Sequence, residues 1–137
     1  MPLTIVAGPA GGGKGNWIRG HEQHGDVEID FTRLFDALFP TLAGAVRGDE
    51  MSAQLRMTQW LKMAAIRHAV DLALNGAITT SDPSVIDGLL TMTGGTRETN
   101  VRIVDPGRGA VIERLRSIQP GRDFDCAQAI ERWYGRL

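Results

Sequence analysis

Residues 3–15 read LTIVAGPAGGGKG, and this stretch decides the fold. Its first five residues are apolar or β-branched, which predicts a buried strand. Five of the next eight residues are glycines, so the strand runs directly into a loop. After Lys14, the segment from Asn16 to Arg19 predicts a short helix that ends at Gly20. The chain is therefore expected to begin with a strand, a glycine-rich loop and a helix.

The loop fits the pattern G-x-x-x-x-G-K, in which inward-pointing backbone N–H groups surround a polyphosphate. Glycine permits loop conformations that a Cβ atom would obstruct. The following helix adds its N-terminal N–H groups and dipole, and Lys14 places a positive charge beside the β- and γ-phosphates. A flexible glycine turn with an incidental lysine is the alternative, but the position between strand and helix favours phosphate binding. The predicted nucleotide-binding residues are Gly8, Pro9, Ala10, Gly11, Gly12, Gly13, Lys14, Gly15 and Asn16.

Gly15 departs from the pattern, which has Ser or Thr at this position to supply a hydroxyl to Mg²⁺. The amide oxygen of Asn16, or an acidic residue acting through water, could hold the metal instead. If no group replaces the hydroxyl, the site binds nucleotide and turns it over slowly or not at all.

Outward from the loop, strand and helix patterns alternate along the chain. Residues 27–29, 77–80 and 101–104 predict three more strands, and 31–39, 51–74, 85–90, 108–118 and 125–134 predict helices. This alternation predicts an α/β fold in one domain, residues 1–137, with a parallel sheet of about four to five strands between two helical layers. The apolar residues of the helix at 51–74 spread around its circumference, which predicts burial on several sides.

The composition is that of an ordinary globular domain, with 42% hydrophobic and 23% charged residues. The net charge of −1 indicates no attraction to nucleic acid or to an anionic membrane. The sequence shows no membrane span or secretory signal, so we expect a soluble cytoplasmic protein. Cys126 has no second cysteine to pair with, and the three histidines, His21, His24 and His68, form no metal-ligand spacing.

Residues 8–14 resemble the Walker A loop of P-loop NTPases. The short helix, the acidic residue after the second strand and the late arginine-rich segment look like a reduced nucleoside or nucleotide kinase. The loop sequence is also similar to that of small P-loop proteins encoded by tailed bacteriophages. These resemblances imply a P-loop NTPase-like three-layer sandwich that uses ATP or another nucleoside triphosphate together with Mg²⁺.

Two aspartates follow predicted strands. Kinases of this group often place a carboxylate near the acceptor hydroxyl or the metal, which is one role for Asp30; the other is to cap the helix at 31–39. Asp82 stands where a Walker B carboxylate would hold the metal, or caps a helix that begins with Pro83. Thr80 and Ser81 are alternative hydrogen-bonding partners for water or phosphate.

Several cations and one aromatic residue are secondary candidates. Arg108 and Arg114, with Arg116, lie on or beside the helix after the fourth strand and could neutralise the charge of a transferring phosphoryl group, or could simply be solvated. Arg33 could reach an acceptor phosphate or only solvent. Trp17 could stack on a base or pack in the core.

The sequence therefore predicts a protein that binds a nucleoside triphosphate and either hydrolyses it or transfers its γ-phosphate to a small-molecule or nucleotide acceptor. Lys14, Asp30, Asp82, Arg108 and Arg114 are the candidate catalytic residues. The alternative is a catalytically weak nucleotide-binding switch or assembly factor, in which residues 41–50 form an element that orders and disorders.

Overall fold

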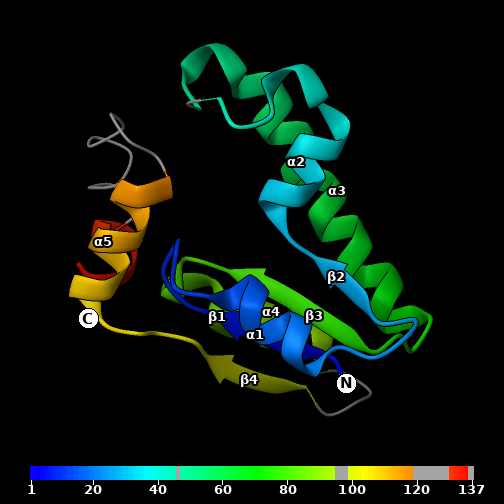
Figure 1. Cartoon of the computed structure of the whole chain (residues 1–137). Coiled ribbons are helices and arrows are strands. Elements are labelled where there is room, and N and C mark those ends of the chain that lie inside the picture. Colours follow the sequence, from blue (N-terminus) through cyan, green and yellow to red (C-terminus); the bar gives the residue numbers. More distant parts are fainter. Residues whose placement is uncertain (46, 95–98, 119–129, 136–137) are drawn as a thin grey trace.

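The protein is an α/β domain built on four parallel strands (Figure 1). The computed structural model describes residues 1–45, 47–94, 99–118 and 130–135. The strands are β1 (Thr4–Ala7), β2 (Val27–Ile29), β3 (Gly76–Thr80) and β4 (Asn100–Ile103), and their order in the sheet is β2-β3-β1-β4. The predicted parallel sheet and the positions of its strands are confirmed, with four strands in the described residues.

Helices connect and cover the strands. They are α1 (Lys14–His21), α2 (Phe31–Leu38), α3 (Ser52–Asp71), α4 (Ile86–Thr93) and α5 (Arg108–Ile118), with short 3₁₀ turns at η1 (Pro40–Leu42), η2 (Asp49–Met51) and η3 (Pro83–Val85). Two of these turns fall within or beside the segment 41–50 that was expected to be a loop. None of the helices in the described ranges combines the length and the apolar character that a membrane crossing requires.

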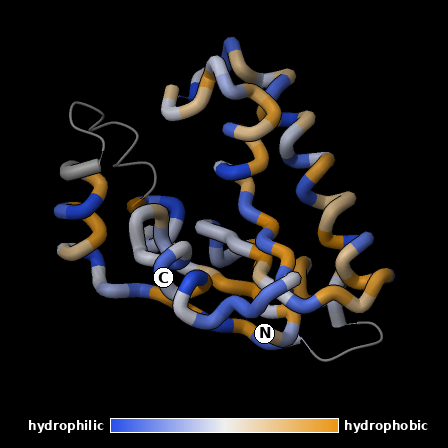
Figure 2. Tube along the Cα trace, turned by 45° about the vertical axis from the view of Figure 1, so that its right-hand side comes forward, coloured by the Kyte–Doolittle hydropathy of each residue, from blue (hydrophilic) through white to orange (hydrophobic). Residues whose placement is uncertain are grey.

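The core lies on both faces of the sheet. On one face, Ile18 of α1 packs against Val6 and Ala77, and on the other, residues of α3 and α4 pack against Ile5 and Ile78. Every residue of β1 and β3 is buried, because these strands are central and have helices on both sides. Figure 2 shows apolar residues both in the sheet and along the helices that pack on it.

The expectation that the helix at 51–74 is buried on several sides was wrong. Helix α3 buries one stripe, Thr58, Lys62, Ile66 and Ala69, whose spacing of three to four residues marks a single helical face. Trp60 on another face is 67% exposed. The reason is visible in Figure 1, where α2 and the first half of α3 rise together away from the sheet and leave only one side of α3 to be covered.

The sheet topology gathers the loops that form the site. Helix α1 connects β1 to β2, and β2 lies on the far side of β3. Helix α4 connects β3 to β4, and β4 lies on the far side of β1. Adjacent strands thus send their connections to opposite sides, and ligands of such sheets bind at this point, outside the carboxyl ends of the strands. Ala7 pairs with Thr80, so the segments that follow these two residues leave the sheet side by side.

Parts of the sequence-based predictions lie outside the described residues. These are Cys126 and residues 125–129, the first part of the last predicted helix. The side chain of Arg116 also lies outside the described part of the chain.

Candidate functional site

The loop between β1 and α1 depends on glycine at specific positions. Gly11 and Gly13 have φ values of 73° and 93°, in the left-handed region that side chains with a Cβ rarely adopt. At Gly8, an added Cβ would lie 2.1 Å from the carbonyl oxygen of Val104. The loop therefore has this shape because three of its glycines provide backbone freedom or room.

Lys14 closes the loop from inside. Its Nζ donates to the carbonyl oxygens of Gly8 at 2.8 Å and Pro9 at 3.0 Å, and to Ser81 Oγ at 2.9 Å. Burial lowers the pKa of Lys14 to about 8, and the nearby charge of Asp30 opposes part of that shift. The lysine therefore joins the loop to the end of β3, and it carries a charge from which water is largely excluded.

A small pocket of about 390 Å³ opens beside this lysine. It is lined by Gly11, Gly12, Gly13, Lys14, Gly15, Asn16, Arg19, Asp30 and Arg114. Six of the nine predicted nucleotide-binding residues are in this set, and so are two candidate catalytic residues from other elements. Arg114 reaches the loop from α5 and donates to the carbonyl oxygen of Gly11 at 3.3 Å. The structure thus brings together loop, helix α5 and the end of β2.

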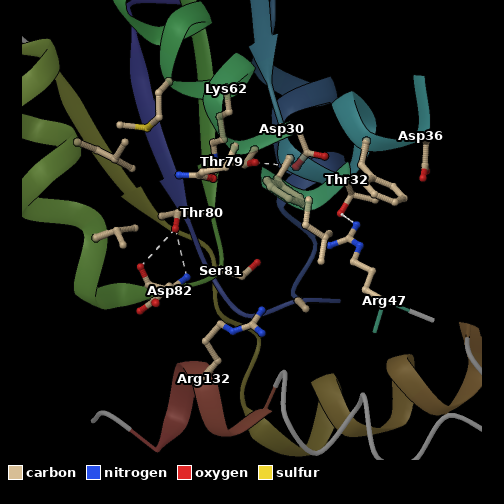
Figure 3. A pocket seen from close by; sticks show the side chains of 18 of the residues that line it. Asp30, Thr32, Asp36, Arg47, Lys62, Thr79, Thr80, Ser81, Asp82 and Arg132 are labelled. Carbon is tan, nitrogen blue, oxygen red and sulfur yellow. Dashed lines mark hydrogen bonds between the residues drawn. The ribbon is translucent and has the colours of Figure 1, made fainter. Parts of the chain in front are cut away.

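A larger pocket of about 1060 Å³ adjoins the first, because Asp30 lines both. Apolar side chains of α2, α3 and α4 form much of its wall, and the polar residues in Figure 3 face its interior. The charged residues that line it are Asp30, Asp36, Arg47, Lys62, Asp82 and Arg132. Ala10 of the glycine loop also lines it. The glycine loop therefore lines both cavities.

Asp30 caps a helix and also faces both pockets. Its Oδ2 accepts a hydrogen bond from Arg33 N at 2.9 Å, which is the capping interaction of α2. Its Oδ1 accepts a hydrogen bond from Thr79 Oγ1 at 2.6 Å. The two roles considered for this residue are therefore compatible, because each carboxylate oxygen has a separate partner.

Lys62 was not among the predicted site residues. It lies in the buried stripe of α3, and its Nζ donates to the carbonyl oxygen of Thr79 at 2.6 Å. Burial lowers the pKa of Lys62, and the charge of Asp30 opposes that shift. One signal in the sequence could have found it, because the chain has only two lysines beside thirteen arginines. In the structure the charge of Asp30 acts on both lysines.

Asp82 caps the turn η3. Its Oδ1 accepts from Ser84 N at 2.9 Å and from Ser84 Oγ at 2.7 Å, and Pro83 occupies the first position of the turn. The capping alternative for Asp82 is thus confirmed, while the carboxylate still borders the larger pocket. Thr80 Oγ1 accepts from Asp82 N at 3.2 Å, which fixes the start of this segment.

The donor set for Mg²⁺ is poor. Asn16 Oδ1, one proposed substitute for the missing hydroxyl, accepts a hydrogen bond from Arg19. The oxygens of Asp30, Ser81 and Asp82 also accept hydrogen bonds already. Within the ranges that the structure describes, no group of three or more His, Cys, Asp or Glu residues could hold a metal ion. Mg²⁺ that is bound together with a nucleotide takes most of its ligands from phosphate oxygens and water and needs only one or two oxygens from the protein, for which Asn16, Asp30 and Asp82 are the candidates.

Three other candidates lie away from the pockets. Arg33 pairs with Glu28 at 2.7 Å. Trp17 stacks on His21 with ring centroids 4.0 Å apart and packs against the apolar cluster on the α1 face. Arg108 is exposed at the start of α5, and none of the three lines either pocket.

Two arginines that the sequence did not single out enter the larger pocket. Arg47 donates to Thr32 Oγ1 at 2.8 Å, and its guanidinium lies 5.2 Å from the ring centroids of Phe31 and of Phe35. Figure 3 shows Arg47 and Arg132 pointing into the space between them from different elements. They reach the pocket only through tertiary packing.

The helical turn that carries Arg132 is fixed to the rest of the domain. Asp105 accepts hydrogen bonds from Trp133 Nε1 at 3.2 Å and Tyr134 Oη at 2.5 Å. Trp133 is also buried. These contacts hold the turn in the position from which Arg132 enters the pocket.

Neither a scan against protein-family models nor a search of curated proteins found a match for this sequence. The function is therefore argued from the geometry of the two pockets.

Proposed function

We propose that this protein binds a nucleoside triphosphate, such as ATP, on the loop from Gly8 to Gly15 and transfers its γ-phosphoryl group to an acceptor in the larger pocket. The observation that carries the proposal is the shared wall of the two pockets. The smaller pocket contains the glycine loop and Lys14, the larger has room for a second molecule, and Asp30 lines both. Two adjoining cavities of this kind suit transfer between two bound substrates better than hydrolysis alone.

The residues around the loop supply charge and orientation. Lys14 and Arg114 line the small pocket, and α1 begins at Lys14, so a triphosphate there would meet positive charge and the N-terminus of a helix. The phosphates would compete with the carbonyl oxygens of Gly8 and Pro9 for the Lys14 ammonium. A charged acceptor binds an ammonium more strongly than a neutral carbonyl does, so this exchange favours the bound state.

Asp30 is placed to act on the acceptor. In the proposed reaction an acceptor hydroxyl oxygen forms a bond to the γ-phosphorus, and the bond from that phosphorus to the β–γ bridging oxygen breaks. The diphosphate keeps the electron pair of the broken bond, and the hydroxyl proton passes to the Asp30 carboxylate. Water in place of the hydroxyl gives hydrolysis by the same steps. Lys14 and Arg114 balance the negative charge that moves toward the diphosphate.

Calorimetric titration with ATP tests the first half of the proposal. The wild-type protein is expected to bind ATP, and Lys14→Met to lose about 1.5–3 kcal/mol or more of binding free energy, as for one charge-assisted contact. Arg33→Gln is the matched control, because Arg33 is a cation paired with Glu28 outside both pockets. Wild-type protein that binds no nucleoside triphosphate would contradict the proposal.

Phosphorus NMR tests the second half. We expect the γ-phosphate signal of ATP to be lost faster with a hydroxyl-bearing acceptor than in buffer, and a new phosphate ester signal to appear. If inorganic phosphate is the only product and forms at the same rate with every acceptor, the reaction is hydrolysis instead.

A nucleotide-binding switch is the second candidate, and one observation favours it. Gly15 provides no hydroxyl for a metal, and the Oδ1 atom of Asp82 accepts two hydrogen bonds from Ser84. A protein with these features would bind nucleotide and hold it with little turnover. Tight ATP binding without transfer or hydrolysis would support this candidate.

A further inference from the structure

Lys62 is a buried cation with few partners. Its side chain is on the covered face of α3, and the residue is 9% exposed. Within the described parts of the chain, its one hydrogen-bond acceptor is the carbonyl oxygen of Thr79, and no carboxylate lies within ion-pair distance. An ammonium has three N–H donors, so two remain for other acceptors. Burying a charge with so little compensation is costly unless something else pairs with it.

Packing does not require a lysine at this position. The neighbouring members of the same stripe, Thr58, Ile66 and Ala69, are uncharged, and an apolar side chain at position 62 would continue their pattern. Among the described residues, the hydrogen bond to Thr79 and the more distant charge of Asp30 compensate part of the cost of this charge. A ligand that brings negative charge into the larger pocket, which Lys62 lines, would compensate the rest.

The surroundings of Lys62 suit an anion of limited size. Arg47 and Arg132 enter the same pocket from other elements (Figure 3). Asp30 and Asp82, two of the three acids in the pocket wall, are engaged as caps and as acceptors of hydroxyl or backbone hydrogen bonds. These neutral donors leave both carboxylates charged, so the three cations and three acids of the wall balance, and an anion would bind where the cations converge, beside Arg47, Lys62 and Arg132.

We propose that Lys62 binds an oxyanion of the second substrate, so that the acceptor is a hydroxyl-bearing small molecule with a phosphate or carboxylate group. The inference rests on the proposed function, because it assigns the larger pocket to the acceptor. Lys14 and Lys62 then have separate ligands, with Asp30 between them. Lys14 contacts the triphosphate and Lys62 contacts the acceptor.

The scarcity of lysine provides a direct test. Protein labelled with ¹³C only in lysine gives two side-chain ε signals, which Lys62→Arg assigns. A non-hydrolysable ATP analogue is added to saturation first, followed by inorganic phosphate in one titration and acetate in another. We expect the analogue to shift the Lys14 signal, and phosphate or acetate then to shift the Lys62 signal while leaving Lys14 in place. The anion that acts at lower concentration identifies the acceptor group as a phosphate or a carboxylate.

The outcomes separate the two proposals. If the analogue shifts Lys14 but neither anion shifts Lys62, the inference about Lys62 is wrong and the proposed function stands. If the analogue shifts neither lysine, the proposed function fails. If both anions shift only Lys14, they compete at the triphosphate site, and the inference is also wrong.

A variant gives a second, independent measurement. Lys62→Met keeps the length of the side chain and removes its charge, so α3 should still pack. We expect affinity for the effective anion to fall about tenfold or more, as for the loss of one charge-assisted hydrogen bond, with affinity for the ATP analogue nearly unchanged. Equal anion affinity in Lys62→Met and wild-type protein would overturn the inference.

Discussion

The buried charge of Lys14 makes the stability of the protein depend on pH. Its pKa is about 8 in the folded protein, against an ordinary value of 10.5, and burial is the main cause. Between these two values the unfolded chain binds a proton that the folded protein has released. Stability therefore rises with pH through this window, and Lys14 lowers stability at neutral pH. For the values given, the free energy of unfolding should increase by about 2 kcal/mol between about pH 7 and about pH 9.5 from this residue alone.

Urea unfolding of wild-type protein and of Lys14→Met, followed by tryptophan fluorescence at several pH values, measures this effect. Between about pH 7 and about pH 9.5, the free energy of unfolding of the wild-type protein should increase by about 2 kcal/mol more than that of the variant. Lys62 has a lowered pKa as well, and burial raises the pKa of Tyr134 to about 12, but both groups are present in both proteins and cancel in the difference. Parallel pH profiles for the two proteins would refute the burial of Lys14. Saturating ATP should reduce the wild-type slope, because bound phosphate keeps the lysine charged.

Three further predictions concern the loop and the cap. Gly15→Ser should be accommodated, because an added Cβ meets only the end of the flexible Arg19 side chain at 3.3 Å. It should raise Mg²⁺-dependent turnover, whereas the control Gly15→Ala should not. Equal turnover in the two variants would show that the missing hydroxyl is not limiting. Gly8→Ala should lower the free energy of unfolding in urea by about 3 kcal/mol, because the added Cβ collides with the Val104 carbonyl oxygen. The control Gly20→Ala, whose Cβ meets nothing within 4 Å, should leave that free energy unchanged or raise it. Equal effects of the two substitutions would contradict the close approach at Gly8. Asp30→Asn should keep the cap of α2 and lose about a hundredfold or more in transfer rate, and both variants lose the charge that stabilises Lys14 and Lys62. Asp30→Ala should lose about 1 kcal/mol of stability beyond Asp30→Asn, because it also removes the cap. Full transfer activity in Asp30→Asn would exclude a base at this position.

Local sequence was sufficient to predict the start of the fold. The apolar run before Gly8 and the glycines after it determine a strand, a loop and a helix within a few residues, and the structure has them there. The parallel sheet also follows from the regular alternation of strands and helices, whereas the order of its strands was not predicted. The burial of α3 could not be predicted in this way, because the spread of apolar residues around a helix does not say how far the helix extends beyond the sheet. The exposed Trp60 shows the consequence.

The cations of the larger pocket could not be predicted, although the candidates Asp30 and Asp82 line it, because these cations meet only after folding. Arg47 follows a connecting segment, Lys62 lies in the middle of a long helix and Arg132 is near the end of the chain. None of them stands in a motif. A lysine at a buried helical position was nevertheless a signal, since an apolar helix face seldom includes an ammonium without a reason.

Asp30 shows why a structural role and a functional one should not be treated as exclusive. Its Oδ2 is held by the backbone of α2 and its Oδ1 by a hydroxyl of β3, so the carboxylate has a fixed orientation before any ligand arrives. A general base must be held in this way, because freedom in the side chain would have to be lost during the reaction. The cap therefore contributes to the proposed chemistry as well as to the helix. In the proposed reaction, transfer would then run from the phosphates at Lys14, past Asp30, toward the anion at Lys62.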